Sequence, residues 1–344
     1  MEHDATRAYR GFTTVAPLRH HSCYLIDMSG ATVHQWALPG PLASNAYLLT
    51  NGNLLCAIIT EEGTPIKSAK GGHMLELDWS GNIVWEHIDH DQHHDFRRLE
   101  NGNTVYLAWE ELSANDIARI SGGVPDTERD GKIYGDVIRE VTQDGATVWE
   151  WHFKDVELEA FPLAIDCQRD EWAHANSLAP TPDGNYLINF RHLDTMMVVS
   201  REDGEILWQQ RDPDWGHPHH AEMQPNGNIT FLANGMNNLA QPLHSRAMEL
   251  DPSTGDIIWF YRDPQKWTFF SPVMGGVQRL ANGNTLICEA TNGRIFEVTA
   301  DGYLVWDFIN PYFLDIPIFD GPSNACFRAY RYAPESPEIG GRVG

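Results

Sequence analysis

Short runs of alternating apolar and polar residues, separated by glycine turns, recur along the whole chain. One unit consists of an apolar run, a turn that contains glycine, and a short run that ends in tryptophan. It occurs six times, ending at Trp36, Trp85, Trp149, Trp208, Trp259 and Trp306. A second unit has apolar runs on both sides of an Asn-Gly-Asn or Asp-Gly-Asn turn, at residues 51–53, 101–103, 183–185, 226–228 and 282–284. Asn-Gly and Asp-Gly supply the positive φ that tight hairpins need, so both units predict antiparallel strand pairs.

The spacing of these units predicts the fold. One unit of each kind accounts for four short strands in about 45–65 residues, which is typical of a propeller blade. We therefore expect an all-β fold, a six-bladed β-propeller in which residues 1–344 form a single domain. No Asn-Gly-Asn turn follows the sixth tryptophan; residues 321–332 take its place, and residues 11–17 precede the first unit. We infer that the N- and C-terminal strands share one blade and close the ring.

Residues 110–136 interrupt this rhythm between the second and third repeats. Within them the segment SANDIARI, residues 113–120, is typical of a short helix. Insertions in a propeller usually gather on one face and border its binding site. The insertion is therefore either a candidate lid over a site or a solvated loop.

The bulk composition restricts the classes of partner. The 344 residues carry a net charge of -24, from 24 basic and 48 acidic side chains. Such a surface repels nucleic acids and anionic membranes, so neither is an expected partner. A small anionic or aromatic substrate, held by a few basic groups in a pocket, is compatible with this charge. The sequence carries no signal for the oligomeric state.

The cysteines and the first residues bear on the cellular compartment. The five cysteines are scattered and contain no CxxC pair, which favours reduced, mostly buried thiols over a disulfide framework. The first residues show neither the basic nor the apolar region of a signal peptide, and no apolar run approaches about 18 residues. We expect a cytoplasmic protein, or a periplasmic one if a leader was removed.

The repeats differ most where the innermost strand of each blade is expected to enter the central channel. At this point the successive repeats carry Asn45, His94, His174, His219 or His220, Gly276 and Asn324. The scaffold does not require histidine here, because half of the blades do without it. His219 matches His94 when the residues are counted from the Asn-Gly-Asn turn, but the neighbouring His220 stays an alternative. Three consecutive blades therefore predict a histidine cluster at the channel entrance.

Further candidates flank these histidines. Arg191 ends the strand that follows His174, and a guanidinium beside imidazoles suits sulfate, phosphate or carboxylate. In so acidic a chain, Arg191 could instead pair with a carboxylate. Trp172 and Trp215 precede the histidine positions and either form a wall for an aromatic substrate or pack at the rim. The candidate amides for substrate binding are Asn45, Asn176 and Asn324.

Two kinds of chemistry fit such a cluster. A neutral imidazole can attack an electrophilic sulfur or phosphorus while the other histidines and the arginine neutralise the growing charge. Alternatively, three imidazoles can hold a metal ion with an open position, or one histidine can act as a general base. The histidines come from separate blades, which does not favour a tight metal site; HPHH, residues 217–220, is the local exception. The nucleophile-elbow and P-loop motifs do not occur.

Two long segments carry the most specific motifs. They are WAHANSLAPTPDGNYLINFRHLDTMMVVSREDGEILW, residues 172–208, and HPHHAEMQPNGNITFLANG, residues 217–235. With the six repeats, they resemble the arylsulfotransferase (aryl-sulfate sulfotransferase) family of six-bladed propellers. The opening GFTTVAPLRHHSCYLIDMSGATVHQW and the closing FRAYRY are also similar to this family, so the resemblance covers essentially the whole chain.

The resemblance implies PAPS-independent sulfuryl transfer from a phenolic sulfate ester to a phenolic acceptor, in two steps through a sulfohistidine. It implies that His219, or His220, is the nucleophile, and that His94, His174 and Arg191 bind the sulfuryl oxygens. No cofactor is implied. A histidine nucleophile must be unprotonated, so activity should fall at acid pH.

Two alternative functions stay open. The first is a metal- or histidine-dependent lyase or hydrolase that acts on an anionic sugar or aromatic substrate in the same channel, and under this alternative a metal ion is bound. The second is a non-catalytic propeller that binds a ligand or a partner on its face.

Overall fold

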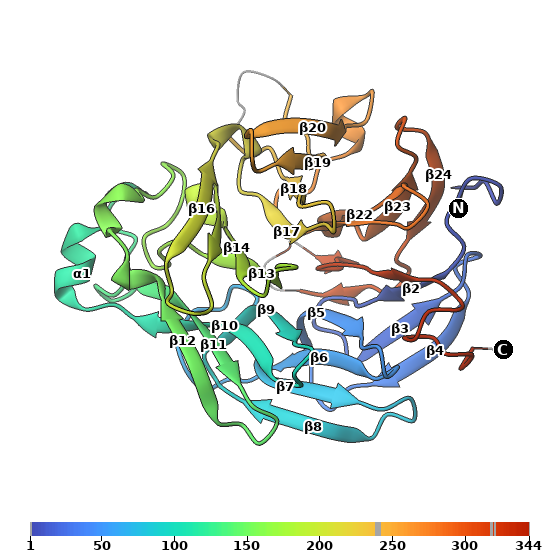
Figure 1. Ribbon diagram of the computed structural model, residues 1–344, viewed down its shortest axis with the longest axis horizontal. Helices are drawn as coiled ribbons and strands as arrows, with labels where there is room; N and C mark the ends of the chain where they lie inside the picture. The colour runs from blue at the N-terminus through green and yellow to red at the C-terminus, as the bar shows by residue number, and fades with distance from the viewer. Residues whose placement is uncertain (1, 238–241, 317–318, 320, 344) are drawn as a thin grey trace.

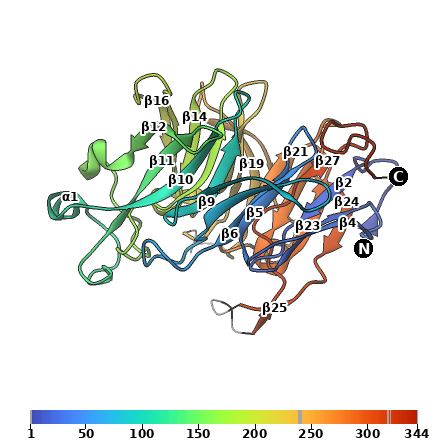
Figure 2. The same ribbon diagram turned by 90° about the horizontal axis from the view of Figure 1, so that it is seen from below.

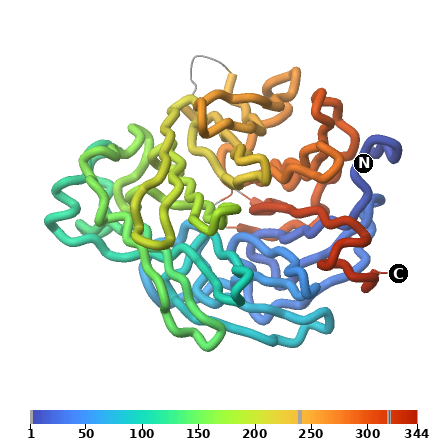
Figure 3. The backbone as a smooth tube through the Cα atoms, viewed as in Figure 1, coloured from blue at the N-terminus to red at the C-terminus, as the bar shows by residue number. Residues whose placement is uncertain are grey.

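The chain folds into six antiparallel sheets arranged around a common centre (Figures 1 and 3). The computed structural model describes residues 2–237, 242–316, 319 and 321–343. Within these residues each sheet of four or five strands is one propeller blade, and consecutive blades follow one another round the ring. The predicted all-β, six-bladed propeller is confirmed.

The first three blades are described here from the channel outward. Blade 1 contains β27 (Arg331–Tyr332), β2 (Phe12–Val15), β3 (Ser22–Ile26) and β4 (Thr32–Ala37). Blade 2 contains β5 (Leu42–Leu48), β6 (Leu54–Ile59), β7 (Gly72–Leu77) and β8 (Ile83–Ile88). Blade 3 contains β9 (Gln92–Arg98), β10 (Thr104–Glu111), β11 (Tyr134–Val141) and β12 (Thr147–His152).

The other three blades repeat this order. Blade 4 contains β13 (Ala175–Pro180), β14 (Tyr186–Phe190), β15 (Thr195–Val199) and β16 (Ile206–Arg211). Blade 5 contains β17 (His219–Met223), β18 (Ile229–Ala233), β19 (Arg246–Asp251) and β20 (Asp256–Tyr261). Blade 6 contains β21 (Gly276–Arg279), β22 (Thr285–Glu289), β23 (Arg294–Val298) and β24 (Leu304–Ile309).

The ring closes as predicted, because strands from both ends of the chain share blade 1. β27, near the C-terminus, pairs antiparallel with β2, near the N-terminus, and provides the innermost strand. A short additional strand, β1 (Glu2–His3), pairs with the outer strand β24 of blade 6. The segment that leads back into the channel carries a small ribbon of β25 (Leu314–Asp315) and β26 (Pro322–Ser323), which projects from the ring in Figure 2.

The repeated tryptophans join neighbouring blades. The indole Nε1 of Trp36 donates to the backbone oxygen of Asp78, in the outer turn of the next blade, at 3.1 Å. The same bond recurs around the ring, and in blade 3 it comes from Trp151. Trp306 donates to the backbone oxygen of Met28 at 2.9 Å and so ties the last blade to the first. These residues are structural, and their repetition follows from the repetition of the interface.

The insertion lies between β10 and β11, inside blade 3. It contains the α-helix α1 (Ala114–Arg119), whose N-terminus is capped by the hydroxyl of Ser113. This is the short helix that the sequence predicts. Single turns of 3₁₀ helix occur at η1 (Phe153–Asp155), η2 (Leu158–Ala160), η3 (Arg191–Leu193), η4 (Pro213–Trp215), η5 (Lys266–Thr268) and η6 (Ala290–Asn292).

The cysteines are buried and free, in agreement with the expectation from their spacing: Cys23, Cys56, Cys167, Cys288 and Cys326. None of the helices in the described part of the chain has the length and apolar content needed to span a bilayer.

Candidate functional site

A cavity of about 470 Å³ lies on the axis of the ring. Loops or strands of all six blades contribute to its wall, together with the insertion of blade 3. Four of the side chains predicted from the sequence line it: His94, His174, Arg191 and His219. The structure therefore brings together one predicted residue from blade 3, two from blade 4 and one from blade 5.

Local irregularities at the inner strands direct these side chains. The register between β9 and β10 shifts beside His94, which has a φ of 47°. His174 precedes β13 with a φ of 54°, and the register between β17 and β18 shifts beside His220, which has a φ of 53°. Positive φ is unfavourable for a residue with a Cβ, and bulges of this kind change the direction in which a strand aims its side chains. Such strain is frequent at functional sites.

His219 is fixed by hydrogen bonds at both ring nitrogens. Its Nδ1 lies 2.8 Å from Oδ1 of Asn234 and 3.0 Å from the backbone oxygen of His217, so Nδ1 carries the proton. Its Nε2 accepts the backbone N–H of Met274 at 3.1 Å. Burial, with the charge of Arg191 second, lowers the pKa of His219 well below its ordinary value. The ring is therefore neutral, with its lone pair on Nε2.

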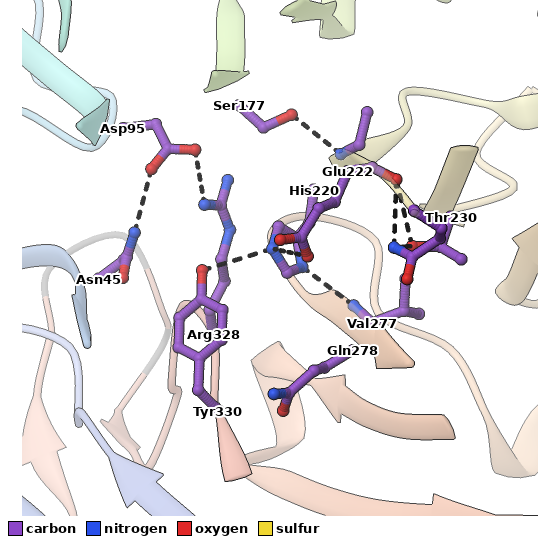
Figure 4. A network of polar contacts seen from close by, with 12 residues as sticks. Asn45, Asp95, Ser177, His220, Glu222, Thr230, Val277, Gln278, Arg328 and Tyr330 are labelled. Atoms are coloured by element: carbon purple, nitrogen blue, oxygen red, sulfur yellow. Dashed lines mark hydrogen bonds and ion pairs between the residues drawn. The ribbon is translucent and has the colours of Figure 1, made fainter. Parts of the chain in front are cut away.

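His220, the alternative nucleophile, faces a different region. Its Nδ1 accepts the backbone N–H of Val277 at 3.1 Å, and its Nε2 lies 3.4 Å from the hydroxyl of Tyr330 (Figure 4). Unlike His219, it does not line the cavity. The sequence left this choice open; the structure places His219 in the cavity and His220 in the polar network behind it.

His174 lies against a carboxylate, without a hydrogen bond between them. Its Nδ1 lies 2.6 Å from Oε2 of Glu171, whose other oxygen accepts the hydroxyl of Ser68 at 2.5 Å. Burial, followed by the charge of Arg191, lowers the pKa of His174 well below its ordinary value. The ring centroid lies 4.5 Å from that of His94. These two rings thus form adjacent parts of one wall.

His94 is backed by two buried groups. Its Nδ1 lies 2.8 Å from Nδ1 of His93, and Nε2 of His93 lies 3.3 Å from Oδ1 of Asp136. Burial, followed by the nearby His174, lowers the pKa of His94 well below its ordinary value. No hydrogen bond to Nε2 of His94 is made by any residue that the structure describes. This nitrogen therefore opens into the cavity.

Arg191 begins η3, immediately after β14. Its backbone N–H donates to the backbone oxygen of His174 at 3.0 Å, which joins the two residues at the end of the blade. Its guanidinium makes no hydrogen bond or ion pair with the described residues; the acidic groups nearby act on it only at longer range. The pairing with a carboxylate that the sequence left open is therefore not observed. A permanent cation without a protein partner is available for an anionic ligand.

The five other candidates for substrate binding lie outside the wall of this cavity. Trp172 stacks on Phe153 at 4.4 Å between ring centroids, within the hydrophobic core. Trp215 packs against Phe231 in the core of the next blade. The three amides are engaged with protein partners: Asn45 with Asp95, Asn176 with the backbone oxygen of Pro218, and Asn324 with the backbone oxygen of Asn310.

Several lining residues had no signal in the sequence, because loops bring them to the site. The apolar part of the wall consists of Leu18, Ile66, Ala69, Val273, Met274 and Phe327. Arg129, from the insertion, also lines the cavity, as do Asp166, His192 and His217. The HPHH segment could have drawn attention to His217; nothing in the spacing marks the others.

One group of three potential metal ligands occurs among the described residues, and it does not contain the predicted histidines. Asp166, Cys167 and His217 have ligand atoms within 4.8 Å of one another. Burial raises the pKa of the Cys167 thiol to about 12, so the thiol is protonated. The two ring nitrogens of His217 already face the Asp166 carboxylate and the backbone oxygen of Arg191, each at 3.0 Å. These groups do not fit a resident metal ion.

Comparisons with known proteins agree with this geometry. The family model described as Arylsulfotransferase (ASST) matches residues 58–311, more than half of the chain. No curated protein matches the chain in sequence. A protein of unknown function from Bacteroides caccae is similar in fold, with 12% identity over 94% of this chain and 99% of that chain and a TM-score of 0.57. A streptogramin B lyase has 13% identity over 89% of this chain and 80% of that chain, with a TM-score of 0.52. At these identities the two structures show the propeller fold alone.

Proposed function

Because the chain belongs to the arylsulfotransferase family, we propose that it transfers a sulfuryl group from a phenolic sulfate ester to a phenolic acceptor. The transfer proceeds in two steps through a sulfohistidine on His219. It needs neither PAPS nor a metal ion. The observation that carries the proposal is the unpaired guanidinium of Arg191 in a cavity lined by His94, His174 and His219.

The charge distribution of the cavity supports an anionic donor. Arg191 presents a fork of N–H donors that matches two oxygens of a sulfate group. The donor's sulfuryl group is bound by Arg191, and His94 and His174 donate to its other oxygens when their Nε2 atoms carry a proton. The aryl ring packs on the apolar part of the wall, of which Phe327 is the aromatic member. Both halves of an aryl sulfate thus find a complementary surface.

In the first step, Nε2 of His219 attacks sulfur. The N–S bond forms, the bond between sulfur and the aryl oxygen breaks, and the aryl oxygen leaves with the electron pair of that bond as a phenolate. Asn234 keeps the proton on Nδ1, so that the lone pair stays on Nε2. The backbone N–H of Met274 must release Nε2 before the attack, because it occupies that lone pair in the resting site. Once released, it is a donor beside the sulfuryl oxygens.

In the second step, the oxygen of an acceptor phenol attacks the same sulfur. The N–S bond breaks, and His219 returns to its neutral state. Donor and acceptor use the same apolar wall in turn, which agrees with ping-pong kinetics. Arg191 contacts the sulfuryl group throughout and disperses the charge that develops on its oxygens.

The test is transfer from 4-nitrophenyl sulfate to phenol, followed by release of 4-nitrophenolate and formation of phenyl sulfate. We expect turnover by the wild type and by His220→Asn, and none by His219→Asn. Release without phenyl sulfate would instead indicate a hydrolase. A requirement for added metal, or tightly bound metal in a stoichiometric amount, would favour the lyase or hydrolase alternative. Binding of aryl sulfates without any turnover would favour the non-catalytic propeller.

A further inference from the structure

Two buried groups behind His94 have no task in the two steps above. We propose that Asp136 and His93 are positioning residues that act through His94 and make it the proton carrier of the reaction. They let its Nε2 give a proton to the leaving phenolate and take one from the acceptor phenol. This inference rests on the proposed function and deepens it, since neither step above assigns the proton.

The three groups form a continuous line from the blade interior to the cavity. His93 and His94 lie in β9, and Asp136 lies in β11 of the same blade. His93 is fully buried and stacks on Trp109 at 4.2 Å between ring centroids. Asp136 is 2% exposed, and its Oδ1 accepts the backbone N–H of Ala175 at 3.0 Å. The line is therefore rigid and closed to solvent except at Nε2 of His94.

Hydrogen-bond accounting assigns the protons in the resting state. An ionised Asp136 carries no proton, and Nε2 of His93 lies 3.3 Å from its Oδ1 as an ion-pair contact that does not meet hydrogen-bond geometry. A proton on Nε2 of His93 is the assignment that is compatible with this charge. Nδ1 of His93 then holds the lone pair, and Nδ1 of His94 must donate to it across 2.8 Å. This leaves the lone pair of His94 on Nε2, facing the cavity. The tautomer of His94 is thus set by a carboxylate two groups away.

His94, His93 and Asp136 together can take up one proton without forming a buried imidazolium. A proton that arrives at Nε2 of His94 allows the Nδ1 proton to move to His93, and the Nε2 proton of His93 to move to Asp136. The end state has neutral rings and a neutral carboxyl group. Burial lowers the pKa of His94 and raises the pKa of Asp136, and both directions favour this end state. Oδ2 of Asp136 is buried without a hydrogen-bond partner, as suits a carboxyl group that is at times protonated.

The proton balance of the reaction then closes within the site. The resting state, with Asp136 ionised, first takes up one proton from solvent at Nε2 of His94, so the cycle starts with Asp136 protonated and a proton on Nε2 of His94. As the bond between sulfur and the aryl oxygen breaks, the aryl oxygen takes the proton from Nε2, and Asp136 becomes a carboxylate. In the second half, the acceptor hydroxyl gives its proton to Nε2 while its oxygen attacks sulfur. The breaking N–S bond restores His219, and the line returns to its starting state.

His94 suits this task better than His174. The charge of Arg191 is the second cause of the low pKa of His174, whereas for His94 the second cause is the neighbouring His174 and a cation, Arg328, comes last. A proton on His174 would face a neighbouring cation, and that ring is therefore better used to contact the sulfuryl group. The ring of His94 also lies edge-on to Phe327, at 6.1 Å between centroids, on the side of the wall assigned to the aryl group.

The first test reads the tautomer without any reaction. With ¹⁵N-labelled histidine, NMR distinguishes a protonated from an unprotonated ring nitrogen. In the wild type, we expect the proton of His94 on Nδ1 at alkaline pH and on Nε2, in a neutral ring, as pH falls. In Asp136→Asn the amide cannot accept a proton, so we expect the Nδ1 tautomer throughout the same range. An unchanged titration in Asp136→Asn would overturn the relay.

The second test compares donors with good and poor leaving groups. We expect Asp136→Asn to slow transfer from phenyl sulfate by about 10²–10⁴-fold, the usual contribution of acid–base catalysis, and to slow transfer from 4-nitrophenyl sulfate by less than tenfold. Because 4-nitrophenolate is a stable leaving group, it needs little proton donation. Glu171→Gln, which alters the partner of His174, is the matched comparison and should slow both donors equally.

Three outcomes would contradict the assignment or the function beneath it. If Asp136→Asn slowed transfer from phenyl sulfate and from 4-nitrophenyl sulfate equally, Asp136 would have only a structural role. If the loss of transfer rate depended on the leaving group in Glu171→Gln and not in Asp136→Asn, His174 would be the proton carrier instead of His94. A wild type that transfers from neither donor would overturn the proposed function, and the NMR titration would still decide whether the relay exists.

Discussion

The cavity and the polar network directly behind it both contain buried histidines and an arginine, but the two arginines differ in whether protein groups pair with them. In the cavity, the guanidinium of Arg191 has no partner among the described residues. In the network, the guanidinium of Arg328 donates to Oδ2 of Asp95 at 2.7 Å (Figure 4). It also donates to the backbone oxygen of Asn176 at 2.8 Å. Where the protein satisfies a charge itself, the charge holds blades together; where it does not, the charge is available to a ligand.

Asp95 shows how the network joins the blades. One of its oxygens accepts from Asn45 of blade 2, and the other accepts from Arg328 and from the backbone N–H of Leu178 in blade 4. Arg97 also donates to it, at 2.6 Å. With this many donors, both oxygens of the Asp95 carboxylate are satisfied by protein hydrogen bonds. The network therefore supports the ring, and the cavity is left for chemistry.

Adjacent histidines give the sharpest test of this comparison. His219→Asn removes the proposed nucleophile, so we expect transfer to fall by at least about 10⁴-fold, in line with the loss of other catalytic nucleophiles. His220→Asn changes the network and should leave the rate within about tenfold of the wild type. Steady-state kinetics with 4-nitrophenyl sulfate and phenol measures both. The reverse pattern would place the nucleophile in the network.

The two arginines should separate function from stability. Arg191→Met removes the donors to the sulfuryl oxygens, and we expect about 10²–10³-fold slower transfer with unchanged or increased stability. Arg328→Met removes one of the two guanidinium partners of the buried Asp95, which keeps Arg97, and should cost about 1–3 kcal/mol of stability. Urea denaturation, with kinetics on the folded fraction, measures both quantities. Marked destabilisation by Arg191→Met would show that its charge is structural after all.

The buried imidazoles of the cavity and of the polar network predict a fold that loses stability at acid pH. Five of them have pKa values lowered well below the ordinary 6.5: His94, His174, His192, His219 and His220. The unfolded chain therefore takes up protons first as pH falls. Stability should be full above about pH 6.5 and decline below it, by up to about 1.4 kcal/mol per pH unit for each group.

Single substitutions isolate each contribution to this slope. Denaturation of the wild type, His94→Asn and His220→Asn at several pH values between about 5 and 7 should show a shallower decline in both variants. The low pKa of His219 also keeps the nucleophile neutral at mildly acid pH, so loss of activity should begin below the ordinary histidine range. Identical slopes in all three proteins would contradict the assignment of neutral buried rings.

The smallest expected effect compares two aromatic residues. Phe327→Leu shortens the aryl wall, and we expect KM for aryl sulfates to rise about 2–10-fold, the value of one aromatic contact. Trp172→Phe alters only the core, so it should lower the melting temperature without changing KM. A change of KM in Trp172→Phe, with none in Phe327→Leu, would return the tryptophan to the role the sequence first gave it.

The ring and most of the proposed catalytic set were visible in the sequence, because a repeat makes departures from it easy to see. His94, His174 and Arg191 stand where the other blades carry different residues, and the structure brings them together with His219. The choice between His219 and His220 depended on a bulge, which inverts the side of the strand that a residue faces. Sequence position alone could not decide it.

Five predicted substrate-binding residues lie outside the cavity wall, and their positions have physical reasons. Trp172 and Trp215 precede the histidines in sequence, yet large aromatic rings at these positions fill blade cores. Asn45, Asn176 and Asn324 were read as ligands because they lie at channel positions, where instead they satisfy backbone and carboxylate groups. His93, Asp136 and Glu171 act through contacts between strands or loops, and no spacing in the chain records such contacts.

The central claim is that His219 carries the sulfuryl group, and a single turnover without acceptor tests it most directly. Mixing the protein with excess 4-nitrophenyl sulfate should release one 4-nitrophenolate per chain in a rapid burst. Mass spectrometry of the quenched protein should then find one sulfuryl group on His219, in the wild type and in His220→Asn, but not in His219→Asn. A protein that shows no burst, or that carries the group on another residue, would contradict the account.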